Sequence, residues 1–140
     1  MNQNKLYFFG GISPININAS YEVFYLNVSQ QFNVSNPPWV DLTMTTPTAA
    51  IPFGSAWGTA VAGDINKDPT IYLFGGVMRD MNSVGDSVLH SFNLNTLQWK
   101  PEAMGKEQPA RRRNLKSVID NTGKFYIFGG ITEKSLNSTT

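Results

Sequence analysis

Three apolar, aromatic runs in this chain end in a pair of glycines, and this recurrence constrains the fold more than any other feature. The runs are Tyr7-Phe8-Phe9-Gly10-Gly11, Tyr72-Leu73-Phe74-Gly75-Gly76 and Tyr126-Ile127-Phe128-Gly129-Gly130. The first glycines of successive pairs lie 65 and 54 residues apart. A strand ending that recurs at such a period indicates stacked sheet units, each built from one copy of a repeat.

The segment 55–104 contains enough apolar runs for one complete four-stranded unit. The first run, 56–62, is rich in small and β-branched residues, and it is followed by a turn-forming segment and the second run, 70–74. The runs 87–94 and 98–101 supply the third and fourth strands. We therefore predict a four-stranded sheet in the middle of the chain.

The flanking segments predict incomplete units. Residues 1–54 hold runs equivalent to strands two to four, at 6–10, 22–28 and 39–42, and end in a connecting loop. Residues 105–140 hold only strands one and two, at 116–119 and 125–128, and end in a tail that we expect to be disordered. Between those last two strands, Asp120-Asn121-Thr122-Gly123 is typical of a tight hairpin turn.

The residues around the glycine pairs resemble the kelch repeat. That family places a glycine pair after the second strand, an aromatic residue on the third, and a tryptophan about seven residues later on the fourth; Phe92 and Trp99 have this spacing. Gln108-Pro109-Ala110-Arg111 and Asn36-Pro37-Pro38-Trp39 are also similar to kelch sequences, the latter to fungal members related to galactose oxidase. The resemblance implies an all-β fold, a partial kelch β-propeller with one complete blade between two incomplete ones. Closed propellers have about 4–8 blades.

A set of repeated glycines and aromatic residues has a structural explanation without any ligand. Glycine permits positive φ and close approach of a neighbouring backbone, and tryptophan supplies a large apolar surface for contact between neighbouring blades. We expect structural roles for Gly10, Gly11, Trp39, Gly75, Gly76, Phe92, Trp99, Gly129 and Gly130.

The composition of the chain offers few of the residues that catalytic and metal sites usually need. His90 is the single histidine and there is no cysteine, which removes multi-histidine metal sites, thiolate ligands and cysteine nucleophiles. We therefore expect no enzymatic activity and no cofactor. The alternative is a fragment of a catalytic propeller, such as a galactose-oxidase-like protein, whose active residues lie outside this chain.

Polar loops at one end of the predicted sheets are the candidate binding surface. The segments 12–20, 43–53, 77–86 and 104–114 share that end because successive strands run up and down. The candidate partner-binding residues are Arg79, Asp80, Asn82, Arg111, Arg112 and Arg113. Either the arginines are simply solvated, or they bind an acidic peptide or carboxylate through the bidentate guanidinium fork. The predicted function is protein–protein interaction.

Charge and hydropathy limit the remaining partners. The net charge of +1 gives no field that favours nucleic acid, and no apolar run is long enough to span a membrane. Open blade edges predict a second type of contact, self-association. The compartment stays open between a cytoplasmic scaffold and the extracellular part of a longer, membrane-anchored protein.

Overall fold

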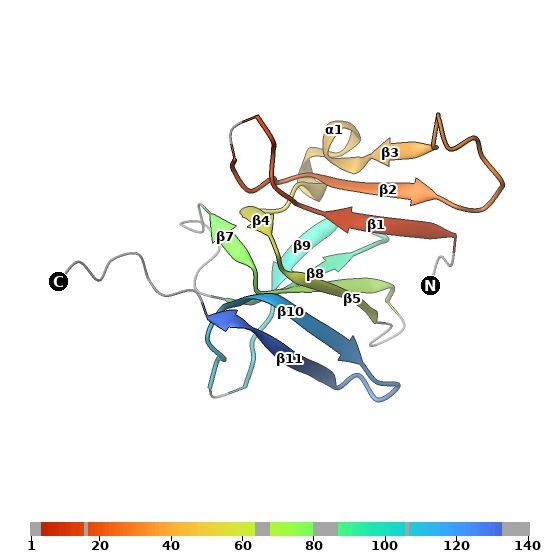
Figure 1. The fold of residues 1–140 in the computed structure, drawn as a ribbon. Helices are drawn as coiled ribbons and strands as arrows, with labels where there is room; N and C mark the ends of the chain where they lie inside the picture. Colours follow the sequence, from red (N-terminus) through yellow and green to blue (C-terminus); the bar gives the residue numbers. More distant parts are fainter. Residues whose placement is uncertain (1–3, 16, 64–67, 80–86, 106, 133–140) are drawn as a thin grey trace.

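Over the residues that it describes, the computed structural model contains three antiparallel sheets that follow one another along the molecule, and a fourth, two-stranded one beside the middle sheet (Figure 1). It describes residues 4–15, 17–63, 68–79, 87–105 and 107–132. We call the three the N-terminal, middle and C-terminal sheets, and the contact between two neighbouring sheets a seam. The nearly all-β architecture agrees with the predicted partial propeller; the number of blades and their boundaries stay predictions.

The N-terminal sheet has the order β1-β2-β3, formed by β1 (Lys5–Phe9), β2 (Val23–Asn27) and β3 (Trp39–Asp41). A short helix, α1 (Leu42–Thr45), follows at once because the Asp41 carboxylate caps it by accepting a hydrogen bond from the Met44 backbone N–H at 3.0 Å. The 3₁₀ helix η1 (Pro47–Ala49) then leads to the middle sheet.

The middle sheet has the order β5-β6-β8-β9. Its strands are β5 (Thr59–Gly63), β6 (Thr70–Phe74), β8 (Leu89–Asn93) and β9 (Gln98–Pro101). Beside it lies a two-stranded ribbon in which β4 (Gly54–Ala56) pairs with β7 (Val77–Arg79).

Two details of the middle region differ from the sequence-based expectation. The run 56–62, predicted as one strand, is divided between β4 and β5 because Trp57 takes a left-handed conformation with φ of 57°. The chain also resumes strand pairing directly after Gly75 and Gly76, where a polar loop was predicted, and Val77 and Met78 of β7 are buried. The ribbon thus extends the apolar interior beyond the glycine pair.

The C-terminal sheet is a hairpin of β10 (Arg112–Ile119) and β11 (Phe125–Thr132). The predicted turn is present: the Gly123 N–H donates to the Asp120 carbonyl at 3.1 Å. The Asp120 carboxylate also accepts hydrogen bonds from the backbone N–H groups of Thr122 and Lys124. Unlike β1 and β6, β11 continues past its glycine pair, although Gly129 and Gly130 both have positive φ.

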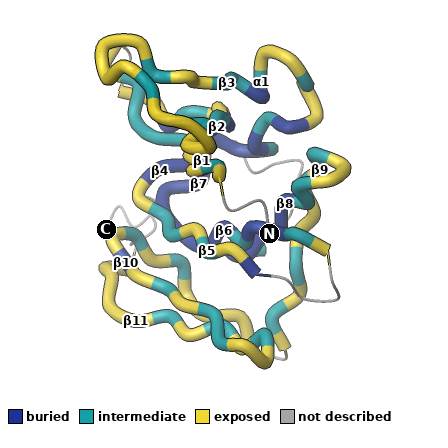
Figure 2. Tube along the Cα trace, turned by 90° about the vertical axis from the view of Figure 1, so that its right-hand side faces the viewer, coloured by how far each residue is buried: buried dark blue, intermediate teal, exposed yellow. Residues whose placement is uncertain are grey.

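The buried side chains lie mainly in the seams, as the dark central part of the tube in Figure 2 shows. Phe9 of the N-terminal sheet contacts Phe92 and Trp99 of the middle sheet, with ring centroids 5.8 and 5.6 Å apart. On the opposite face of the middle sheet, Tyr72 and Phe74 contact Phe125 of the C-terminal sheet. The two seams therefore use opposite faces of the middle sheet, as alternation along a strand requires.

The glycine pairs bring the backbones of neighbouring sheets together. The Gly11 N–H donates to the Ser55 carbonyl at 2.8 Å, and the Gly76 N–H donates to the Arg112 carbonyl at 2.7 Å. Gly75 has φ of 64°, and a Cβ atom placed on it would lie 2.6 Å from the Arg112 carbonyl oxygen. Only glycine fits this conformation and this approach without displacement of the next sheet.

Candidate functional site

The end of the sheets where β1 and β11 terminate carries the irregular connections predicted to bind a partner. On the left of Figure 1 lie the connection that follows β1, strand β7 and the start of β10. We call this end of the molecule the loop face. It holds the described candidate residues Arg79, Arg111, Arg112 and Arg113.

The loop face also holds an exposed aromatic ring with a cation beside it. Trp57 occupies the break between β4 and β5 and is 49% exposed. The guanidinium of Arg113 lies over this ring, 5.7 Å from its centroid, and the Asn114 N–H donates to the Trp57 carbonyl at 3.0 Å. The contact therefore joins the middle and C-terminal sheets and holds an exposed tryptophan in a fixed position.

The other arginines of the loop face lie on or just before strands β7 and β10. Arg112 is exposed, opens β10 and donates from Nη1 to the Gly129 carbonyl at 3.3 Å. Arg79 ends β7, pairs with Gly54 and is exposed. Arg111 precedes β10 and is half-buried. Arg79 and Arg112 are thus anchored by strand pairing at their backbones while their side chains are exposed.

Three arginines of this region, Arg79, Arg112 and Arg113, have no ion pair with a described carboxylate. Arginine and aromatic side chains are the types enriched where proteins bind one another. This part of the surface therefore suits a partner that presents carboxylates around an apolar contact.

The structure brings only part of the predicted set together. Arg79 and Arg111 to Arg113 share the loop face, whereas Asp80 and Asn82 lie outside the described residues. Trp57 was missed, because the small residues around it read as a strand interior. The signal available was the Trp57-Gly58 pair itself, a large aromatic residue beside a glycine in a run otherwise composed of small residues.

The repeated residues expected to be structural occupy two kinds of environment. Phe92 and Trp99 lie in the seam with the N-terminal sheet. Gly10 and Gly75 leave no room for a Cβ atom beside the backbone of the next unit, and Gly11 and Gly76 donate their N–H groups to it. Trp39 and Gly129 lie on outer faces instead: Trp39 is 48% exposed, and a Cβ atom on Gly129 would meet nothing within 4 Å. Gly130 lies against Leu115 and the Arg113 carbonyl.

His90, the single histidine, lies in the core. It is fully buried against Phe53, with ring centroids 4.6 Å apart, and neither ring nitrogen finds a hydrogen-bond partner among the described residues. Burial lowers its pKa to about 4, against a smaller opposing effect of Glu102. The described residues also contain no group of three His, Cys, Asp or Glu side chains that could hold a metal ion.

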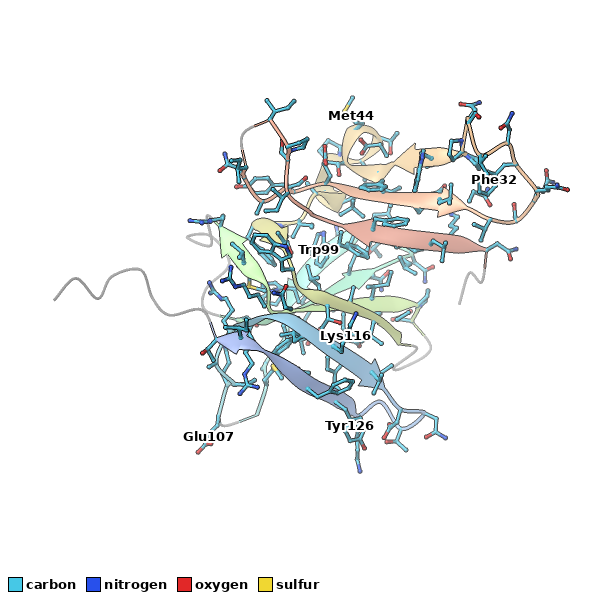
Figure 3. The ribbon with its side chains drawn as sticks, viewed as in Figure 1. Phe32, Met44, Trp99, Glu107, Lys116 and Tyr126 are labelled. Atoms are coloured by element: carbon cyan, nitrogen blue, oxygen red, sulfur yellow. The ribbon has the colours of Figure 1, made fainter. Side chains whose placement is uncertain are left out.

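A small hollow of about 160 Å³ lies at the opposite end of the sheets, near the β2–β3 connection where Figure 3 labels Phe32. Its lining is uncharged, formed by Asn27, Ser29, Gln30, Gln31, Phe32 and Pro38. Cofactor and substrate pockets are usually larger, about 300–1,000 Å³. Over the described segments, none of the helices has the length and apolar character needed to cross a bilayer.

Comparison with known proteins identifies relatives that carry kelch motifs. The chain is similar to the human "Rab9 effector protein with kelch motifs", with 33% identity over 106 residues, 75% of this chain and 26% of that protein. The bovine protein of the same name is 34% identical over 106 residues, and the mouse protein 36% identical over 94 residues, which cover 65% of this chain and 23% of the mouse protein. These relatives support the kelch-repeat family.

The match is partial with respect to the relatives. The chain spans about a quarter of the length of the human and bovine proteins. No family model matches the chain. None of the relatives named here is a galactose oxidase, so that part of the resemblance stays a prediction.

Proposed function

We propose that this chain is a non-catalytic protein-interaction module of kelch type that binds its partner through the loop face. The observation that carries the proposal is the half-exposed Trp57 ring with the Arg113 guanidinium over it. A rigid aromatic anchor beside arginine is the combination that most often dominates binding energy at protein interfaces.

The partner that we propose is an acidic surface of a small GTPase of the Rab class. The relatives are named as effectors of Rab9, which supports this partner class. The charge pattern supports the acidic surface: a carboxylate pairs bidentately with a guanidinium, and such a pair is stronger than a contact with lysine. Arg112 and Arg79 present exposed guanidinium groups for this purpose.

The experiment is a calorimetric titration of the purified chain with Rab9 loaded with a GTP analogue or with GDP. We expect saturable binding that weakens with added salt, because exposed charges are screened. The double variant Arg112→Ala/Arg113→Ala and the single variant Trp57→Ala should each lower the affinity at least about tenfold, the equivalent of roughly 1.4 kcal/mol.

The matched control is Lys5→Ala/Lys124→Ala, which removes two positive charges from the start of β1 and the hairpin turn, at the opposite end of the strands from the loop face. Equal loss of affinity in the control would show that net charge, and not the arginine surface, drives binding. Arg112→Lys keeps the charge but removes the guanidinium group, so we expect a partial loss of affinity if the contact with the carboxylate is bidentate. Absence of binding to either nucleotide form of Rab9 would exclude that partner.

A further inference from the structure

The two outer sheets each expose an apolar face that resembles one half of a seam. On the N-terminal sheet, the residues that point away from the middle sheet are apolar except for Asp41; the apolar ones are Leu6, Phe8, Phe24, Leu26 and Trp39. We call this the N-end face. On the C-terminal sheet, Tyr126 and Phe128 of β11 and Val118 of β10 point away from the middle sheet, together with Lys116, which pairs with Phe128. We call this the C-end face.

The C-end face is equivalent to the side of each sheet that packs onto the next one. Phe9, Phe74 and Phe128 all directly precede the glycine pair. Phe9 packs onto Phe92 and Trp99, and Phe74 is only 1% exposed. Phe128 is 55% exposed, and Figure 3 labels Tyr126 on the outer side of the C-terminal sheet. The difference is the lack of a following sheet over this face among the described residues.

The N-end face is equivalent to the side of each sheet that receives the preceding one. Strand register aligns Trp39 with Trp99, because Leu26 pairs with Trp39 as Phe92 pairs with Trp99. Phe8 aligns with Leu73, which is 3% exposed, whereas Phe8 is 39% exposed and Trp39 48%. The rings of Phe8, Phe24 and Trp39 already contact one another at 5.2–5.5 Å, so the receiving surface is preformed.

We propose that two copies of this chain associate head to tail, the C-end face of each copy packing on the N-end face of the other. Phe128 of one copy would then meet Leu26 and Trp39 of the other, as Phe9 meets Phe92 and Trp99 within the chain. The binding partner is a second copy of the chain because each chain carries both complementary surfaces, the C-end face and the N-end face.

The number of sheets needed to close a ring explains why we propose two copies. A head-to-tail contact produces a ring when the rotation closes and a filament when it does not. Each chain contributes three sheets, so two chains make six, within the range of about 4–8 blades seen in closed propellers. The arrangement is independent of the loop face, which lies at the ends of the strands.

The test is the molar mass in solution, measured by light scattering during size-exclusion chromatography. We expect twice the 15.5 kDa of the chain at about 100 μM, well above the roughly 1 μM dissociation constant expected of a weak specific dimer. Phe128→Lys and Trp39→Glu should each give monomers, since each places a charge in both contacts of the ring. A monomeric wild type, or a series of growing oligomers, would overturn the proposal.

Mixing the two monomeric variants separates head-to-tail from other arrangements. In the mixed pair one contact is unmodified and the other joins lysine to glutamate, so the dimer should reappear. If mixing does not restore it, or if only one of the two variants is monomeric, the head-to-tail contact is wrong.

Folding of the variants is checked by circular dichroism and urea midpoint. If Trp39→Glu is unfolded, Leu6→Glu replaces it, because Leu6 is 53% exposed and has the same outer position. Tyr126→Lys likewise replaces Phe128→Lys. The control is Val34→Ser, which removes an 84% exposed apolar residue from the β2–β3 connection and should leave the dimer intact.

Discussion

The middle and C-terminal sheets carry the same motif and yet bury it very differently. Tyr72-Leu73-Phe74 and Tyr126-Ile127-Phe128 both form the second strand of a sheet and both end in a glycine pair. Phe74 is enclosed by the C-terminal sheet, whereas Phe128 faces outward. The motif therefore determines the strand and its turn, and the neighbouring sheet determines the burial. In such arrays stability resides largely in contacts between neighbouring units.

The largest effect should come from the seam tryptophan. Trp99→Ala removes a ring that packs on Phe9 and Phe92 and whose Nε1 donates to the buried Ala49 carbonyl at 2.9 Å. We expect a loss of about 3–5 kcal/mol in the free energy of unfolding. Trp39→Ala, at the equivalent place on the outer sheet, should cost only about 1 kcal/mol because the ring is half-exposed.

Both values come from urea denaturation in the Phe128→Lys background, so that self-association does not contribute. Equal losses for the two tryptophans would show that the seams do not stabilise the fold.

The next effect concerns the glycine pairs. Gly75→Ala combines a positive φ with a Cβ that would lie 2.6 Å from the Arg112 carbonyl oxygen, so we expect a loss of about 3 kcal/mol. Gly129→Ala has the same backbone conformation but open space around the new atom, so only the conformational part, about 1–2 kcal/mol, remains. Thermal unfolding of the two variants side by side measures the difference, and a larger loss at Gly129 would contradict the account.

A smaller, pH-dependent effect distinguishes the middle sheet from the N-terminal one. At the position where the middle sheet has His90, the N-terminal sheet has Phe24. Because burial lowers the His90 pKa from 6.5 to about 4, the unfolded chain binds the proton more tightly than the folded chain. The stability contributed by neutral His90 is thus complete above pH 6.5 and declines as the pH falls toward 4.

His90→Phe copies the residue of the N-terminal sheet and should remove this decline. The measurement is the urea midpoint between pH 7 and 4 for both proteins, since the carboxylates common to both cancel in the difference. Parallel curves would show that His90 does not titrate in that range.

The smallest effect is expected on the loop face. Arg113→Ala removes a cation–π contact between a half-buried guanidinium and the half-exposed Trp57 ring, and should lower the free energy of unfolding by about 0.5–1 kcal/mol. The same substitution is expected to weaken partner binding far more, which is the reverse of the pattern at Trp99. A loss of stability comparable with Trp99→Ala would assign Arg113 to the fold instead of to binding.

The repeat and the second strand of each sheet could be predicted from the sequence because the backbone at the glycine pairs requires glycine. Gly75 must be glycine where the Arg112 carbonyl approaches, and the Asp120–Gly123 turn requires its own residue types. Those constraints act through local backbone conformation, so they determine which residue types occur at these positions and can be recognised in the sequence.

The break at Trp57 left no such pattern. Trp57 and Asn114 occupy equivalent places before β5 and within β10, and both have φ of 57°. Asparagine adopts that conformation readily and tryptophan does not, so at Trp57 the packing of the next sheet determines the backbone. The pairing of Trp57 with Arg113 follows from the same packing across 56 residues of sequence, which is why the site could be predicted only in part.

The stacking of successive sheets is tested most directly by an engineered disulfide across a seam. Thr59 of β5 and Ser117 of β10 place their side-chain oxygens 3.0 Å apart, and the chain has no cysteine of its own. In the double variant Thr59→Cys/Ser117→Cys, the two β-carbons should approach the roughly 3.8 Å typical of a disulfide. We expect near-complete intramolecular oxidation of the folded protein, detected as loss of titratable thiols without change in molar mass. Two thiols that stay free in the folded, oxidised sample would contradict the stacked arrangement.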